Sequence, residues 1–474
     1  MNPADDELAA LLKRAADHAI AYRRDVGDPS GPVTSSYAEA LATFDAPTPD
    51  GGEAASAVID ALVEAAGPGL RAYSGPRFFG WVIGASHPVG VAADWLTSTW
   101  GQNAGNHFAS PAAAAAETVA ARWLLDLFDL PREASVGFVT GATAANFVGL
   151  AAARGAVLRR RGWDVEANGL FGAPPIDIVI GEEAHSTVFS ALQFLGLGHD
   201  RVRRVAVDDQ GRMLADAFAA TLAQCSGPVI AVAQAGQLNT GAFDPLPAIG
   251  KLTREAGAWL HIDGAFGLWA RTSPAKAPLA AGIELADSWA TDGHKWLQTP
   301  YDCGYAIVRD AEAHRAAMTI AASYLPPVAV GERDPSHFVP ELSRRARGFA
   351  TWAMIRHLGR QGIAAMVERH CALAQHLAQR LVTESGVYVL NDVVLNQIIV
   401  RFGERDAGER GDKLTRQTIA LIQAEGTCFA GGASWRGAWV MRLSVIGFPM
   451  NEAEMDRSAD AIHSAWRAVR YANT

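Results

Sequence analysis

The chain has 474 residues, of which 49% are hydrophobic and 19% are charged, and its formal net charge is −9. This composition is typical of globular proteins and excludes wholesale disorder. The acidic balance argues against a protein that binds nucleic acid regardless of sequence, because such a protein needs a basic face. Only five residues are lysine, so a function that needs a side-chain amine has five candidates: Lys13, Lys251, Lys276, Lys295 and Lys413.

The cysteine pattern and the hydropathy of the chain limit its location. The four cysteines are widely spaced and include no Cys-x-x-Cys pair, so neither a metal site nor a disulfide framework is indicated. The first residues lack the basic start and apolar core of a signal peptide. No uninterrupted apolar run reaches the roughly 18 residues of a membrane helix. We therefore expect a cytoplasmic protein with no membrane association, no nucleic-acid partner and no bound metal.

Three regions follow one another along the chain. Residues 1–77 are predicted to be a helical segment, because apolar residues recur at helical spacing over 5–24 and 55–66. Residues 78–345 alternate short β-rich runs with helical stretches, a pattern that predicts a mostly parallel sheet covered on both faces. Residues 346–474 mix long helices with short strands and are predicted to form a smaller α+β domain.

The predicted elements follow this division. In the large domain we expect helices over 112–128, 144–161, 186–195, 214–223 and 246–256, and strands over 136–140, 176–180, 202–207, 229–233, 259–262, 288–291 and 304–308. In the small domain we expect strands over 387–390, 398–402 and 439–444, and helices over 346–383, 414–424 and 452–470, the first with a break near Gly359.

Four segments that follow predicted strands carry residues suited to chemistry. Ligands of open parallel sheets bind at the carboxyl ends of the strands, so this placement favours a shared site. In the first segment, Ala142 and Thr143 follow a glycine and open a helix. Backbone N–H groups at such a helix start can bind a phosphate, although an ordinary strand-to-helix turn explains the same pattern.

The second and third segments contain a histidine and an aspartate. His185 could stack on a planar ring or transfer protons, or it could simply precede a helix capped by Ser186. Asp263 ends an apolar strand, and a buried carboxylate there would need a cation or hydrogen bonds. A helix N-cap is the alternative for Asp263, but the following Gly-Ala-Phe-Gly is more typical of a pocket wall.

The fourth segment contains Lys295, which lies between His294 and Trp296. A lysine that is partly desolvated has a lowered pKa and can act as an amine nucleophile. Pyridoxal phosphate (PLP) requires four features of this kind: a phosphate-binding turn, a side chain that stacks on its ring, an anion at its ring nitrogen and a reactive lysine. Asp263 and Lys295 are 295 − 263 = 32 residues apart, which places them on nearby strands.

From about Pro76 onwards the chain resembles the PLP-dependent group II amino acid decarboxylases, a family that includes aromatic amino acid, glutamate and tyrosine decarboxylases. The segments that carry the resemblance are DSWATDGHKWLQTPYDCG, HIDGAFG, AHSTV, PRFFGWVIGASHP and SPAAAAAETVAARWL. The resemblance implies the fold of type I PLP-dependent transferases, with a mostly parallel seven-stranded sheet, a small C-terminal α+β domain and an N-terminal helical segment. It also implies a homodimer whose active site lies at the subunit interface and whose N-terminal helices intertwine.

By the same resemblance, the reaction is decarboxylation of an L-amino acid to the amine and CO₂ through a Schiff base on Lys295. Asp263 would pair with the pyridine nitrogen and His185 would stack on the ring. Ala265 would pack on the opposite ring face. The remaining cofactor contacts would line the phosphate, namely Ala142, Thr143, Asp292 and His294.

The substrate pocket is expected to include an apolar wall of Phe79, Trp81 and Ile83, with Asn103 offering a polar contact. Dimer packing is the alternative role for these residues. The stretch 326–341, where relatives carry a catalytic tyrosine, contains none. His337 and Phe338 are the residues expected to take its place, and Tyr324 lies just before the stretch. Because loss of the catalytic tyrosine is associated with oxidative decarboxylation and deamination in the family, an aldehyde is the alternative product.

Asp292 is a further departure, because asparagine is frequent at this position in the family. A carboxylate beside a phosphate is unfavourable unless it is protonated or balanced, and His294 is the residue expected to balance it.

Three other functions are weighed. Another PLP reaction on the same scaffold, such as transamination, is compatible with the same residues. An inert binding homologue is disfavoured by the presence of Lys295 and Asp263. An NAD-dependent dehydrogenase is disfavoured because no G-x-G-x-x-G follows the first strand.

Overall fold

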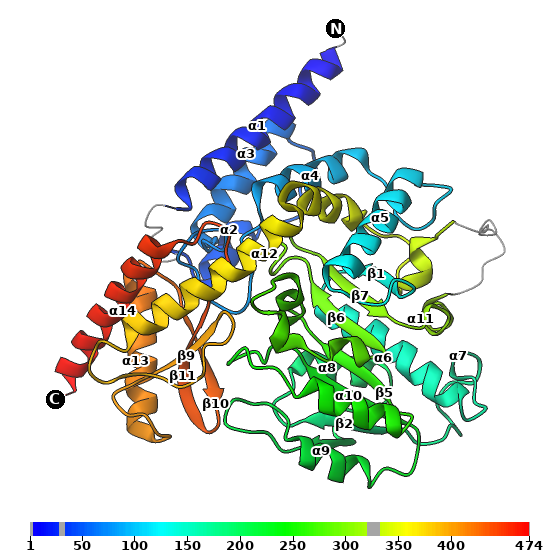
Figure 1. The fold of residues 1–474 in the computed structure, drawn as a ribbon. Helices are drawn as coiled ribbons and strands as arrows, with labels where there is room; N and C mark the ends of the chain where they lie inside the picture. Colours follow the sequence, from blue (N-terminus) through cyan, green and yellow to red (C-terminus); the bar gives the residue numbers. More distant parts are fainter. Residues whose placement is uncertain (1–2, 28–33, 320–331, 474) are drawn as a thin grey trace.

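The computed structural model describes residues 3–27, 34–319 and 332–473 (Figure 1). Its helices are α1 (Pro3–Asp25), α2 (Tyr37–Phe44), α3 (Ala55–Ala66), α4 (Pro88–Trp100), α5 (Pro111–Leu127), α6 (Ala142–Arg159), α7 (Val165–Asn168), α8 (Ser186–Phe194), α9 (Ala215–Leu222), α10 (Leu246–Glu255), α11 (Ala311–Met318), α12 (Arg347–Leu381), α13 (Glu409–Glu425) and α14 (Glu452–Ala472). Its strands are β1 (Ser135–Val139), β2 (Asp177–Gly181), β3 (Val202–Val205), β4 (Val229–Gln234), β5 (Trp259–Asp263), β6 (Ser288–Asp292), β7 (Gly304–Val308), β8 (Val387–Val389), β9 (Gln397–Phe402), β10 (Gly431–Trp435) and β11 (Ala438–Ser444).

The large domain is built on a seven-stranded sheet with the strand order β1-β7-β6-β5-β4-β2-β3. β7 runs antiparallel to its neighbours β1 and β6, and the pairs β6–β5, β5–β4, β4–β2 and β2–β3 are all parallel. The predicted mostly parallel seven-stranded sheet is therefore confirmed, and all seven predicted strands are present. The carboxyl ends of β5 and β6 are adjacent, which brings Asp263 and the turn before Lys295 together as expected.

Helices cover both faces of this sheet. Successive side chains along a strand point to opposite faces, so each strand packs against both helical layers. In β2, Ile178 and Ile180 pack into one core with Val188 of α8, whereas Val179 points to the other face and packs with Phe218 of α9. Strands β1 and β4 to β7 are buried at every position. Such continuous burial is typical of a parallel sheet between two helical layers.

The small domain is a four-stranded antiparallel sheet in the order β10-β11-β9-β8. α13, α14 and the second half of α12 cover it (Figure 1). The break expected near Gly359 is confirmed as a kink in α12, where this glycine has a φ of 60° that other residues rarely adopt. β10 was not predicted, because its glycine-rich start has low strand propensity. It forms because Gly432 leaves room for the ring of Trp439 on β11.

The N-terminal helices lie apart from both cores. α1 extends away from the body of the chain and runs beside α3 (Figure 1), to which Arg14 and His18 bind through Asp60. α2 and α3 contain no buried residue. Apolar side chains on the three helices are 41–56% exposed, namely Leu8, Leu12, Ile20, Leu41, Phe44, Val58, Leu62 and Val63.

The segment around Phe79, at the start of the predicted large domain, is hydrogen-bonded to the small domain. Phe79 N–H donates to Phe429 O at 2.8 Å, and Ser444 N–H donates to Phe79 O at 3.1 Å. The Phe79 side chain is buried in the small-domain core. In the part of the chain that the structure describes, no helix is long and apolar enough to cross a membrane.

Candidate active site

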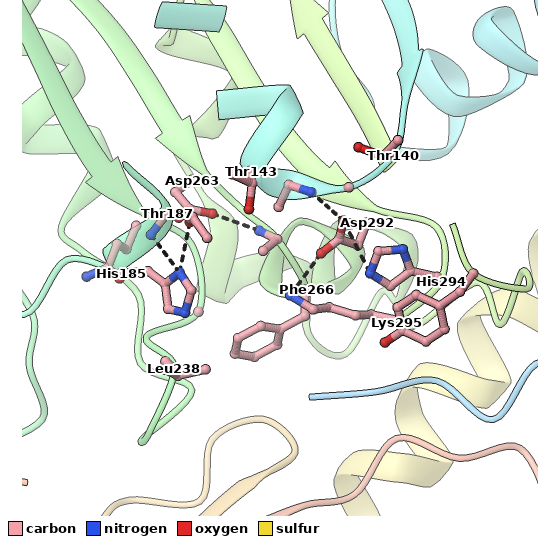
Figure 2. A pocket seen from close by; sticks show the side chains of 16 residues that line it. Thr140, Thr143, His185, Thr187, Leu238, Asp263, Phe266, Asp292, His294 and Lys295 are labelled. Carbon is pink, nitrogen blue, oxygen red and sulfur yellow. Dashed lines mark hydrogen bonds and ion pairs between the residues drawn. The ribbon is translucent and has the colours of Figure 1, made fainter. Parts of the chain in front are cut away.

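A cavity of about 340 Å³ opens at the carboxyl ends of the large-domain strands. All eight predicted cofactor contacts line it, namely Ala142, Thr143, His185, Asp263, Ala265, Asp292, His294 and Lys295. In Figure 2, Asp263 and His185 lie at one end of the pocket, and Asp292, His294 and Lys295 lie at the other. The strand ends that the sequence places far apart along the chain therefore form one site.

The end with Lys295 is formed by the start of α6 and the turn after β6. The N–H of Ala142 donates to Asp292 Oδ1 at 2.6 Å, and Lys295 Nζ lies 2.9 Å from Asp292 Oδ2. Gly141 makes this turn compact, because a Cβ atom would lie 3.1 Å from His294 Cε1 and 3.3 Å from Asp292 Oδ1, which is tighter than ordinary contact. The α6 N-terminus and the lysine together give this end the positive potential that attracts a phosphate.

At the other end, Asp263 is 5% exposed. Its Oδ1 accepts the N–H of Ala265 at 3.2 Å, and its Oδ2 accepts Asn146 Nδ2 at 3.4 Å. Asn146 is held in turn by His261, whose Nε2 lies 2.9 Å from Asn146 Oδ1. None of the ion pairs among the described residues includes Asp263. A buried carboxylate with only two long hydrogen bonds suits a ligand that brings a positive charge to this end.

His185 is the N-cap residue of α8, so the helix-start alternative is correct for its backbone, although the cap is His185 and not Ser186. Its Nδ1 lies 2.8 Å from Thr187 Oγ1, which fixes the ring. Burial lowers the pKa of His185, and the positive charges of Lys295 and Arg442 lower it further, against the opposite effect of Asp263. The ring is therefore neutral at neutral pH and suited to stacking.

Tyr301 completes the pocket beside Lys295. Its ring stacks on His294 with 4.3 Å between the ring centroids. Burial raises the pKa of Tyr301 well above its usual value, so its hydroxyl stays protonated. Burial also lowers the pKa of His294, which is therefore neutral at neutral pH.

Arg442 of β11 brings a cation from the small domain towards the pocket. Its Nη1 donates to Asn239 Oδ1 at 3.4 Å, next in the chain to Leu238, which lines the cavity. Burial lowers the pKa of Arg442 to about 10, which still leaves the guanidinium charged at neutral pH. No ion pair among the described residues includes this side chain, so it is available to an anionic group of a ligand.

The five predicted substrate residues do not line this cavity within the described part of one chain. The Phe79 side chain is 0% exposed in the small-domain core, and a substrate role for it stays a prediction. Trp81 is 49% exposed and stacks on Phe429 with 5.8 Å between the ring centroids. Ile83 is half-buried and precedes Gly84, whose N–H donates to His294 O at 3.1 Å. Substrate roles for Trp81 and Ile83 stay predictions.

Asn103 and His337 lie further from the cavity. Asn103 Oδ1 accepts the N–H of Arg344 at 2.9 Å, which gives the side chain a structural role. His337 lies on a short 3₁₀ helix, with its Nε2 at 4.0 Å from Asp334 Oδ2. The first part of the stretch 326–341, up to residue 331, lies outside the described residues. A role of this stretch at the active site stays a prediction.

The sequence reasoning missed Arg442 and several lining residues, among them Gln234 and Tyr301. Gln234 is the last residue of β4, so the strand-end rule that found Asp263 also applies to it. Tyr301 lies six residues beyond Lys295 in the same strand-to-strand connection. Arg442 lies in the segment SWRGAWVMRLSV, which also resembles the family, but its strand belongs to another domain and the strand-end rule does not apply to it.

This arrangement fits PLP. The unpaired Asp263 suits a protonated ring nitrogen, the glycine-bounded α6 N-terminus suits a phosphate, and Lys295 supplies the amine between them. Among the described residues, no group of three His, Cys, Asp or Glu side chains could hold a metal ion.

Comparison with known proteins agrees with this fit. Residues 38–402 match the model of the pyridoxal-dependent decarboxylase conserved domain. The chain is 28% identical to L-2,4-diaminobutyrate decarboxylase of Rhizobium meliloti (strain 1021), over 81% of this chain and 77% of that protein. It is 24% identical to 4-hydroxyphenylacetaldehyde synthase of Rhodiola rosea, over 99% of this chain and 96% of that protein.

Solved structures show the same fold. The crystal structure of Oryza sativa TDC with PLP and tryptamine superposes with a TM-score of 0.90 at 22% identity, covering 99% of both chains.

Proposed function

The chain belongs to the pyridoxal-dependent decarboxylase family and is a PLP-dependent carboxy-lyase. We propose which of its residues bind the cofactor and which bind the L-amino acid substrate. The observation that carries this proposal is the meeting of Asp263, Lys295 and the α6 N-terminus at the ends of adjacent strands. The products are the corresponding amine and CO₂.

When bound, PLP supplies an electron-accepting ring that takes up the electron pair left as the carboxylate leaves the α-carbon. Asp263 holds a proton on the ring nitrogen and so keeps the ring electron-poor. Lys295 supplies the amine that attaches the cofactor and that the amine of the substrate replaces. Neutral His185 stacks on one ring face and Ala265 packs on the other, which holds the ring still.

The phosphate is proposed to bind at the start of α6. Ala142 and Thr143 offer backbone N–H groups there, and Thr143 adds a hydroxyl. The ring of His294, which Tyr301 covers, forms the outer side of this end. These residues would hold the phosphate at the end of the pocket where Lys295 lies.

Arg442 is proposed to bind a carboxylate of the substrate. It is a partly buried cation without an ion-pair partner among the described residues, and it is close enough to His185 to lower its pKa. A charge-assisted hydrogen bond to a carboxylate is among the stronger contacts that a substrate can make. Arg442 would thereby place the substrate between the large and small domains.

A panel of L-amino acids tests the proposal. The protein reconstituted with PLP is incubated with each amino acid, and CO₂, amine, aldehyde and hydrogen peroxide are measured. We expect CO₂ and amine in equal amounts from at least one amino acid. Absence of CO₂ from every member of the panel would contradict the proposal.

Oxidative decarboxylation to an aldehyde is the second candidate. The stretch 326–341 contains no tyrosine, and one similar protein is an aldehyde synthase. In that reaction molecular oxygen is reduced to hydrogen peroxide, while the amino acid yields the aldehyde, CO₂ and ammonia. Peroxide and aldehyde in place of amine would identify this outcome.

The same chain is proposed to act as a homodimer with the active site at the subunit interface. The exposed apolar residues of α1 to α3 support this proposal, since patches of this kind mark protein contacts. Sedimentation of the wild type should give a dimer. The double variant Leu8→Glu, Leu12→Glu should dissociate more readily, while Lys13→Glu, at a 74% exposed site on the same helix, should not. A cytoplasmic location stays a prediction for cell fractionation to test.

A further inference from the structure

Asp292 binds two parts of the pocket at once. Its Oδ1 accepts the Ala142 N–H at 2.6 Å, and its Oδ2 lies 2.9 Å from Lys295 Nζ. Its own N–H donates to Ala265 O at 2.9 Å, and its carbonyl accepts Trp269 Nε1 at 2.9 Å. The side chain is only 3% exposed. Strand backbone and close packing therefore hold this carboxylate inside the pocket.

The two partners of Asp292 are the groups that a phosphorylated cofactor needs. A phosphate binds where the first N–H groups of a helix are free, and in α6 the carboxylate takes the first of them. The aldehyde of the cofactor needs the amine of Lys295, whereas in this structure that amine lies 2.9 Å from Asp292 Oδ2. Asp292 thus stands where the cofactor must bind.

Attachment of the cofactor also removes the counter-ion of this carboxylate. Lys295 is the cation nearest to Asp292 among the described residues, and His294, with Nε2 at 3.6 Å from Oδ1, is the other basic group at ion-pair distance. His294 was expected to balance the charge. Burial lowers the pKa of His294 against the opposite effect of Asp292, so this expectation stays a prediction. Once Lys295 is used, a carboxylate and a phosphate face each other at close range and repel.

We propose that Asp292 is a positioning residue that competes with the cofactor phosphate for the α6 N-terminus and with the cofactor aldehyde for Lys295, and so weakens retention of PLP. The proposal rests on the proposed function. It makes PLP readily exchangeable in this chain, so that the fraction of active protein follows the supply of cofactor.

The test is a titration of the cofactor-free protein with PLP and with pyridoxal, which lacks the phosphate, followed by the visible absorbance of the lysine-bound cofactor. Asp292→Asn keeps the shape and an acceptor for the Ala142 N–H but removes the charge. We expect the dissociation constant for PLP to fall at least about tenfold, or 1.4 kcal/mol. That for pyridoxal should fall by a smaller factor, because only the competition for Lys295 is relieved.

Asp302→Asn is the matched control, because it removes the same charge from a carboxylate that pairs with Arg347 at 2.8 Å. Both dissociation constants should stay unchanged in this variant. Thermal unfolding of each cofactor-free variant verifies that it is folded.

Unchanged or weaker PLP binding in Asp292→Asn would overturn the inference, since the carboxylate would then help to hold the phosphate. An equal fall in the dissociation constants for PLP and for pyridoxal would overturn the proposed competition with the phosphate. Failure of the wild type to bind PLP at all would contradict the proposed function itself, which separates the two failures.

Discussion

The part of the pocket that is proposed to hold the cofactor (the cofactor end) and the part that is proposed to hold the substrate (the substrate side) are built in different ways. The cofactor end consists of strand ends and one helix start from the large domain, and its residues Asp263, Asp292 and His294 are at most 8% exposed. The substrate side takes Arg442 from the small domain, and Trp81 of the entering segment lies outside the cavity. Cofactor binding is therefore expected to depend on the large domain alone, whereas substrate specificity is expected to depend on how the small domain packs against it.

The largest expected effect is at the cofactor end. In Lys295→Ala the amine that attaches the cofactor is lost, so we expect activity below about one-thousandth of the wild type and no visible band of lysine-bound cofactor. Lys251→Ala, on an exposed part of α10, is the control and should behave as the wild type. A retained band in Lys295→Ala would show that another lysine serves.

Asp263→Asn should preserve cofactor attachment but remove the charge that holds a proton on the ring nitrogen. We expect kcat to fall about a hundredfold, as for other groups that stabilise developing charge, with the visible band still present. Asp287→Asn, at the opposite end of the neighbouring strand β6, is the control. An activity close to that of the wild type in Asp263→Asn would contradict the assigned pairing.

Arg442→Gln tests the substrate side. Loss of a charge-assisted hydrogen bond should raise KM about ten- to a hundredfold, while cofactor binding stays unchanged, and Arg442→Lys should recover part of the loss. Arg436→Gln, on the same hairpin but bound to Asp208 O, is the control. If the cofactor band disappeared along with activity in Arg442→Gln, the division between the two ends would be wrong.

The smallest effect concerns the framework of the cofactor end. Burial lowers the pKa of His261 and of His370 to about 3 each. These histidines support Asn146 and Trp296, the residue after Lys295. Unfolded histidines take up protons near pH 6.5, whereas these two stay neutral in the folded chain. The stability they contribute is therefore complete above pH 6.5 and is lost as the pH falls towards about 3.

We expect the free energy of unfolding to fall by up to about 1.4 kcal/mol per pH unit for each such histidine in that range. Urea unfolding at pH 7.5 and pH 5.5 measures it, and His370→Gln should lose less stability between the two pH values than the wild type. Equal stability of the wild type at both values would refute the assignment.

Much of the large domain could be predicted from the sequence. Short apolar runs such as Ile178–Ile180 have to be strands because they are buried on both faces, and chemistry-bearing residues directly after them have to meet at one edge of a parallel sheet. For this reason Asp263, Lys295 and Thr143 were found without the structure. Local rules sufficed because each of these residues lies on the strand or helix that positions it.

The remaining features depend on contacts between parts of the chain that are distant in sequence. Phe79 has the character of a pocket wall, but its backbone pairs with Phe429 and Ser444, and its ring fills the small-domain core. Arg442 reaches the site only because β11 is packed against the large domain. The sequence alone thus predicted the strands of the large domain, the cofactor and the lysine proposed to hold it. Only the tertiary structure decided the partners of Asp292 and the side chains facing the substrate, since burial and charge pairing depend on which surfaces meet.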